Sequence, residues 1–107
     1  MANSKMLVFS NAVAGQDDAF NEWYDTQHLA DVTAVPGVLA GRRYDLVPGP
    51  IPTADGPPHR YLAVYELSDD PDKVVEAFRA RAATGEIALS PALDLTTLAV
   101  SVWRARD

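Results

Sequence analysis

Blocks of apolar residues with different spacings predict six secondary-structure elements in this chain of 107 residues. Short runs rich in β-branched and aromatic residues predict four strands, over residues 5–10, 38–47, 60–67 and 95–104. Apolar residues at helical spacing predict two helices, from about residue 16 to residue 34 and from residue 71 to about residue 85. Pro36 ends the first helix, because a proline disfavours helical geometry in the residue before it. Asp70 and Pro71 are typical of a helix N-terminus and mark the start of the second.

The order β-α-β-β-α-β predicts an α+β, ferredoxin-like fold with a four-stranded antiparallel sheet and two helices on one face. A sheet with one face in water alternates apolar and polar residues. Here several strands carry apolar side chains on both faces; in the last strand Val100 and Val102 lie on one face, and Ala99 and Trp103 on the other. Two helices cover only one face, so we expect a second copy of the chain to cover the other in a homodimer. The length fits a single domain over residues 1–107.

The charge and composition of the chain exclude several classes of partner and site. The net charge is -6 and no basic cluster is longer than the pair Arg42 and Arg43, which argues against nucleic acid or an anionic membrane as a partner. There is no cysteine, so disulfides and thiolate metal sites are excluded. The apolar run at residues 6–9 is too short for a signal sequence or a membrane span, so we expect a cytoplasmic protein.

Residues 48–59 hold five of the eight prolines and predict a loop. The loop is long for a connection between neighbouring strands. It is either a fixed lid or arm that reaches the partner subunit, or a variable surface loop.

The first predicted helix carries the residues best suited to chemistry. Tyr24 and His28 are four residues apart and therefore share a helical face, with Phe20 one turn earlier and Trp23 beside them. Histidine transfers protons near neutral pH, and a tyrosine hydroxyl can donate a hydrogen bond to a developing oxyanion. The alternative is structural: aromatic residues at this spacing are often core, and a lone histidine on a semi-apolar face is often a satisfied core residue.

Further polar residues are candidates for the same pocket. Asp25 and Asp31 each lie three residues from His28, and either one is placed to orient its imidazole. Arg42 and Arg43 point to opposite faces of their strand, so one of them can enter a pocket or a dimer interface, with a surface salt bridge as the alternative. We expect the substrate-binding residues to be Trp23, Asp31, Arg43, Tyr44, Tyr61 and Tyr65. No metal site is expected, because His28 and Asp31 have no identifiable third ligand and His59 is isolated in the sequence.

One stretch of the chain matches a known pattern, formed by Phe20, Trp23, Tyr24, Asp25, His28 and Asp31, then Val35-Pro36-Gly37, then Arg42-Arg43-Tyr44. With the order of elements, it resembles the dimeric α/β-barrel superfamily and in particular its EthD-like members. The resemblance implies that two ferredoxin-like sheets pack face to face into a barrel across a dimer. It also implies a pocket in each subunit between its own sheet and helices.

The resemblance leaves the reaction open, because the superfamily includes polyketide cyclases, monooxygenases, isomerases, haem-dependent enzymes and proteins without known activity. The residues match the haem-binding members only in fold, so we expect no cofactor. We predict an EthD-like enzyme of the polyketide-cyclase type that cyclises, dehydrates or isomerises a small apolar carbonyl or phenolic compound. In this reaction His28 removes or delivers a proton and Tyr24 or an arginine stabilises an enolate. The alternatives are a cofactor-free, quinone-forming monooxygenase and a non-catalytic protein that binds a small ligand.

Overall fold

The computed structural model describes residues 4–49, 58–68 and 70–106. Their elements follow the predicted order: β1 (Ser4–Ser10), α1 (Asp17–Trp23), η1 (Tyr24–His28), α2 (Leu29–Thr33), β2 (Val38–Asp45), β3 (Tyr61–Leu67), α3 (Pro71–Ala83) and β4 (Ala99–Arg104). The first predicted helix is thus one continuous helical stretch, with the π-helical segment η1 between two α-helical parts. The sequence pattern predicted the extent of this helix but not its π-helical middle.

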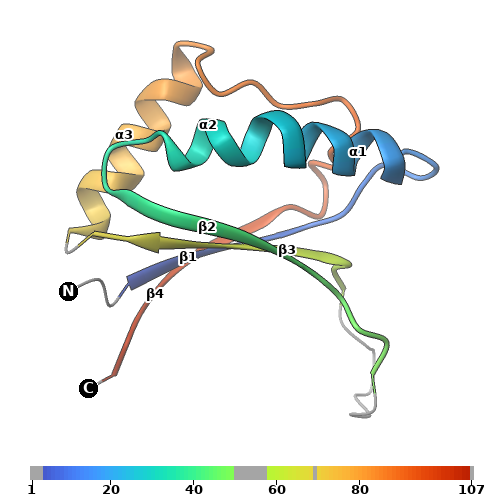
Figure 1. The fold of residues 1–107 in the computed structure, drawn as a ribbon, viewed down its shortest axis with the longest axis horizontal. Coiled ribbons are helices and arrows are strands. Elements are labelled where there is room, and N and C mark those ends of the chain that lie inside the picture. The colour runs from blue at the N-terminus through green and yellow to red at the C-terminus, as the bar shows by residue number, and fades with distance from the viewer. Residues whose placement is uncertain (1–3, 50–57, 69, 107) are drawn as a thin grey trace.

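The four strands form one antiparallel sheet in the order β2-β3-β1-β4. Both helical stretches lie on the same face of this sheet, and none of the described residues forms a helix on the other face (Figure 1). The predicted ferredoxin-like α+β fold is therefore confirmed. No helix in the part of the chain that the structure describes is both long and apolar enough to cross a membrane.

Local signals explain most of the element ends. The Asp70 side chain accepts a hydrogen bond from the backbone N–H of Lys73, which caps α3 as predicted. Gly85 follows the end of α3 with φ +81°, a conformation that glycine adopts without strain. The predicted strand over 38–47 is shorter at its end, since β2 stops at Asp45. Most of the predicted loop, residues 50–57, lies outside the described residues. Its role as a lid or arm therefore stays a prediction.

The predicted strand over 95–104 was wrong in its first four residues, because β4 begins at Ala99. The reason lies in Asp94, whose carboxylate accepts hydrogen bonds from the backbone N–H and the hydroxyl of Thr96, at 2.9 and 2.6 Å. It also accepts one from the Thr97 hydroxyl at 3.2 Å. These bonds hold the chain in a turn and exclude an extended strand there.

Strand pairing determines which side chains face the helices. Met6 lies opposite Tyr65 on β3 and opposite Val102 on β4, so these three side chains share the helix-covered face. The core between helices and sheet is built from Met6, Phe20, Tyr24, Val32, Val35, Ala63, Tyr65, Leu67 and Val74. The opposite face presents Leu7, Phe9, Leu62, Val64 and Trp103, and Trp103 is 58% exposed. A second copy of the chain on this apolar face stays a prediction.

Candidate functional site

A cavity of about 440 Å³ lies between the helical layer and the sheet. Its polar side chains, among the described residues, are Ser10, Tyr24, His28 and Tyr65. The rest of the lining is apolar or glycine: Met6, Val8, Val32, Phe78, Ala82, Gly85, Ile87, Ala88, Leu89, Leu93, Leu98 and Val100. Leu89 and Val100 are about half exposed, at 51% and 56%, so the cavity opens to solvent between β4 and the segment that follows α3.

The π-helical segment η1 supplies two of the four polar groups. The backbone N–H of Leu29 bonds to the carbonyl of Tyr24, five residues back, which widens this turn of the helix. Within it, the rings of Tyr24 and His28 lie edge to face with their centroids 4.8 Å apart, and both side chains are buried. Single π-helical turns occur often at functional sites.

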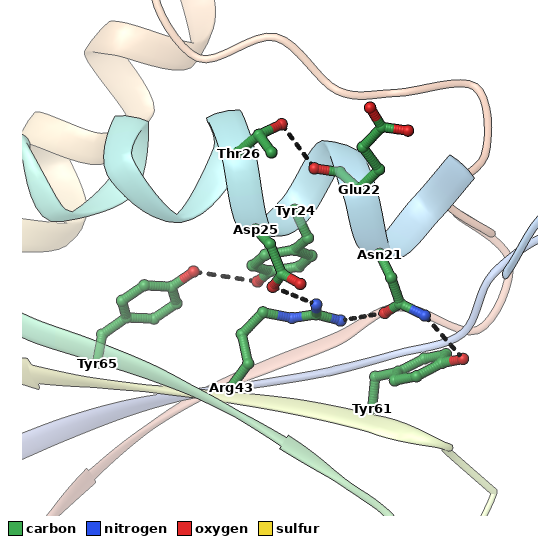
Figure 2. Close-up of polar contacts among 8 residues, drawn as sticks. All are labelled: Asn21, Glu22, Tyr24, Asp25, Thr26, Arg43, Tyr61 and Tyr65. Atoms are coloured by element: carbon green, nitrogen blue, oxygen red, sulfur yellow. Dashed lines mark hydrogen bonds and ion pairs between the residues drawn. The ribbon is translucent and has the colours of Figure 1, made fainter. Parts of the chain in front are cut away.

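Two tyrosines of the cavity lining form a hydroxyl pair. The Tyr24 and Tyr65 hydroxyl oxygens, from η1 and β3, lie 3.0 Å apart, and either can be the donor (Figure 2). Burial raises the pKa of Tyr24 and, more strongly, that of Tyr65, because a phenolate loses its hydration there. Both phenols are therefore neutral at pH 7, and one of the two protons is left free for a ligand.

His28 lies beside this pair and is 6% exposed. Its ring stacks on Trp23, with centroids 4.5 Å apart, and its Nδ1 is buried without a hydrogen-bond partner among the described residues. Burial lowers the pKa of His28 to about 4; the nearby Arg43 also lowers it and the charge of Asp31 partly opposes the shift. The pKa of His28 therefore lies below the near-neutral value typical of histidine, and the imidazole is neutral at pH 7.

Asp25 does not orient His28 as proposed, because it pairs with Arg43. The Arg43 guanidinium donates to Asp25 Oδ1 at 2.7 Å and to Asn21 Oδ1 at 2.8 Å (Figure 2). It also lies 4.4 Å from the centroid of the Tyr24 ring. Arg43 thus supports the back of Tyr24 and does not line the cavity, which matches the salt-bridge alternative.

Asn21 was missed as a partner of this arginine. Asn21 and Asp25 are four residues apart, a spacing that places them on one face of the helix and was available in the sequence. Asp31 makes no hydrogen bond to His28 among the described contacts and affects it only through its charge.

Two of the predicted tyrosines lie elsewhere. Tyr61 donates a hydrogen bond to Asp17 Oδ2 at 2.6 Å and accepts one from Asn21 at 3.4 Å, so it binds the start of the helix to β3. Tyr44 points to the helix-free face of the sheet and is 46% exposed. The structure therefore brings Tyr24, His28 and Tyr65 together in the cavity. Trp23, Asp31 and Arg43 are not among its lining residues, and Tyr61 and Tyr44 border a different hollow.

That second hollow, of about 490 Å³, lies where β2 ends and β3 begins, beside Tyr44, His59 and Tyr61. It is larger than the cavity between helices and sheet, but its described lining has no cluster of buried polar groups, since Tyr44 is partly exposed and His59 bonds to the carbonyl of Thr97. The smaller cavity is therefore the better candidate site. No group of three His, Asp or Glu side chains that could hold a metal ion occurs within residues 4–49, 58–68 and 70–106.

Comparison with known proteins identifies the fold. The sequence matches no family model and no curated protein. Among solved structures, an EthD family protein from Bacillus halodurans superposes with a TM-score of 0.69 at 21% identity, over 97% of this chain and 99% of that one. An EthD-like protein from Ralstonia eutropha superposes with a TM-score of 0.62 at 12% identity, over 97% and 93%.

The heme-degrader MhuD from Mycobacterium tuberculosis, solved with two hemes in its active site, superposes with a TM-score of 0.61 at 19% identity, over 95% of this chain and 94% of that one. The chain thus has the ferredoxin-like fold of EthD-like proteins over nearly its whole length, as the sequence resemblance implied. At these identities the likeness establishes the fold and leaves the reaction open.

Proposed function

We propose that this protein is a small enzyme that works without a cofactor on an apolar carbonyl or phenolic compound held in the cavity between helices and sheet. The observation that supports this most is the cluster of Tyr24, Tyr65 and His28 inside an otherwise apolar cavity. Concave, mostly apolar sites with a few converging polar groups are the usual form of small-molecule sites.

The reaction we propose is keto–enol chemistry. A proton leaves the carbon next to the ligand carbonyl and passes to a hydroxide ion from the solvent, which becomes water, while the enolate oxygen accepts hydrogen bonds from the polar cluster. The enolate then takes up a proton at a second carbon, which isomerises the ligand, or attacks a second carbonyl, which closes a ring. Expulsion of a neighbouring hydroxide gives dehydration instead. Neutral donors that are fixed in an apolar cavity stabilise such a developing charge more than water does.

The lining favours cofactor-free chemistry. Haem carries carboxylates, and none of the described residues that line the cavity is a lysine or arginine able to neutralise them. Among the described residues of the lining, the groups of a kind that binds haem iron are the imidazole of His28 and the phenols of Tyr24 and Tyr65, and the two phenols are hydrogen-bonded to each other. The donor set therefore fits haem poorly, and we derive no step through it.

The test is hydrogen exchange with deuterium at carbon. Acetylnaphthalene and benzoylacetone are incubated with the protein in D₂O, and loss of the protons next to their carbonyls is followed by NMR. We expect exchange faster than in buffer, and a decrease of about 10- to 100-fold in Tyr24→Phe. Thr26→Ala, on the exposed side of the same helical segment, is the matched control and should retain the rate. A wild-type rate equal to that of buffer with both ketones would contradict the proposal.

A non-catalytic ligand-binding protein is the second candidate. It is favoured by the protonation states of the cluster, since at pH 7 its phenols and imidazole are all neutral and none is a strong acid or base. This candidate predicts saturable binding, with the ligand recovered unchanged and no exchange at carbon. A monooxygenase would instead consume oxygen with anthrone or a hydroquinone, which an oxygen electrode measures in the same samples.

A further inference from the structure

The environment of His28 determines which of its nitrogens carries the proton. A neutral imidazole has one N–H and one lone pair. At Nδ1, which is buried with no hydrogen-bond partner in the described part of the chain, a proton would create an orphaned buried N–H, and such groups are rare in proteins. The proton therefore lies on Nε2. Because Nδ1 has almost no accessible surface, Nε2 is also the nitrogen that can meet a molecule in the cavity.

The tyrosine pair supplies a second donor next to the first. Whichever hydroxyl donates within the 3.0 Å bond between Tyr24 and Tyr65, the other keeps a free proton. The ring of Tyr24 lies 4.8 Å from that of His28, so the free hydroxyl and the imidazole belong to one end of the cavity. Ser10, whose side chain is also buried in the lining, is the remaining polar group.

The described residues around the cavity offer no free positive charge to an anionic ligand. The described lining holds no lysine or arginine, and the nearest guanidinium, that of Arg43, is engaged by Asp25 and Asn21 behind Tyr24. A carboxylate placed here would lose its hydration without gaining an ion pair, which is costly in an apolar cavity.

From these three observations we propose that the polar end of the cavity recognises one neutral carbonyl oxygen through two donors, the Nε2–H of His28 and the free hydroxyl of the Tyr24–Tyr65 pair. The preferred ligand is then an uncharged, apolar ketone or aldehyde. This inference rests on the proposed function for its site and narrows its ligand class. It assigns His28 the role of a hydrogen-bond donor in place of the proton acceptor that its sequence context suggested.

The tautomer is measured directly by NMR. The chain has only two histidines, so ¹⁵N–¹H spectra of the wild type and of His59→Gln assign the ring of His28 without ambiguity. We expect the Nε2–H tautomer at pH 7, with Nδ1 in the lone-pair form. The Nδ1–H tautomer, or an imidazolium at pH 7, would overturn the inference.

Ligand class is tested with three naphthalenes of similar shape. Acetylnaphthalene carries the carbonyl, isopropylnaphthalene replaces it with hydrocarbon, and naphthoate replaces it with a charge. We expect acetylnaphthalene to bind about 10- to 100-fold more tightly than the hydrocarbon, as two neutral hydrogen bonds allow, and naphthoate to bind most weakly. Equal binding of ketone and hydrocarbon, or tightest binding of naphthoate, would overturn the inference.

Variants test whether the preference for the ketone over the hydrocarbon comes from His28 and the tyrosine pair. His28→Phe and the double variant Tyr24→Phe/Tyr65→Phe should each lose about 10-fold of the preference for the ketone. Both should still bind isopropylnaphthalene, which shows that the cavity is intact. His59→Gln is the control and should keep the full preference. Retention of the preference in both cavity variants contradicts the inference.

These experiments separate the inference from the proposed function, because they need no turnover. Ketone preference with the Nε2–H tautomer but without exchange at carbon leaves the inference standing and rejects the enzyme. Exchange at carbon with the Nδ1–H tautomer supports the enzyme and overturns the inference about the two donors.

Discussion

The hydroxyl oxygens of Tyr24 and Tyr65 lie 3.0 Å apart and join the π-helical segment of the first helix to the inner strand β3. Both side chains are almost fully buried, at 2% and 0% exposure. The contact connects elements that are 41 residues apart in the sequence, and it lies in the wall of the candidate cavity. It therefore links the stability of the fold to the chemistry proposed for the site.

The energetic coupling of this pair is the first prediction. Tyr24→Phe or Tyr65→Phe leaves the other hydroxyl buried without its partner, so each should cost about 1–2 kcal/mol of unfolding free energy. The double variant should cost less than the sum by about 1 kcal/mol, because it removes both groups together. Urea unfolding of the four proteins measures this. Strict additivity would mean that the hydroxyls do not interact in solution.

Acid should destabilise the protein through His28. Its pKa is about 4 in the folded chain against 6.5 unfolded, so the unfolded chain binds more protons between these values. Stability is thus complete above pH 6.5 and falls as the pH drops toward 4, by on the order of 3 kcal/mol from this group. The measurement is the urea midpoint from pH 7 to pH 4 in the wild type and in His28→Phe. The variant should lose this part of the slope and His59→Gln should keep it; parallel slopes in wild type and His28→Phe would refute the shift.

Replacing Arg43 should destabilise the protein more than replacing its ionic partner Asp25. The Arg43 side chain is 13% exposed and packs over Tyr24, whereas the side chain of Asp25 is 62% exposed. Arg43→Ala should cost about 2 kcal/mol, from the lost cation–π contact and two hydrogen bonds. Asp25→Ala should cost under about 1 kcal/mol, as solvent screens exposed ion pairs. Arg43→Lys should not restore stability, because lysine lacks the planar fork that reaches Asp25 and Asn21 together. Equal losses in the two alanine variants would contradict this order.

Gly41 positions Tyr65. A Cβ atom at this glycine would lie 2.8 Å from two ring atoms of Tyr65 and 2.9 Å from Cγ2 of Thr33. Gly41→Ala should therefore destabilise the protein by about 1–3 kcal/mol and displace the Tyr65 ring from Tyr24. Adding Thr33→Ser removes one of the two contacts and keeps the hydroxyl, so it should restore part of the stability. Urea unfolding of both variants gives the comparison, and a neutral Gly41→Ala would show that the ring has room to move.

The helix-free face of the sheet should pair with a second copy. It presents Leu7, Phe9, Leu62, Val64 and the half-exposed Trp103, and apolar patches of this kind mark interaction surfaces. Light scattering should give about twice the chain mass of 11.6 kDa. Trp103→Glu places a charge at this face and should shift the mass to that of one chain. A wild-type monomer at micromolar concentration would exclude the dimer.

Much of the architecture was readable in the sequence, because its signals are local. Asp70 and Pro71 start α3, Pro36 follows the first helix, and the spacing of apolar residues sets the order of elements. The start of β4 was misjudged because the leucines of residues 95–98 suit a strand as well as a turn. The hydrogen bonds of the Asp94 side chain decide between them.

The candidate site could be predicted only in part from the sequence, because it depends on which face of the sheet each side chain occupies. Tyr24 and His28 could be paired from their spacing, but Tyr44 and Tyr65 look equally suitable in a sheet with apolar residues on both faces. Strand register decides between them: it sets Tyr65 opposite Met6 beneath the helices and turns Tyr44 to the other face.

The elements, their order and the residue types available for chemistry thus follow from local patterns, since these depend on neighbours along the chain. The chemical state of His28 follows only from the three-dimensional packing around it. Its low pKa, its unpartnered nitrogen and its closeness to the hydroxyl pair follow from burial between layers that are distant in sequence. Desolvation and long-range contacts leave no trace in local spacing, which is why a residue that reads as a base near neutral pH is a neutral imidazole in the fold.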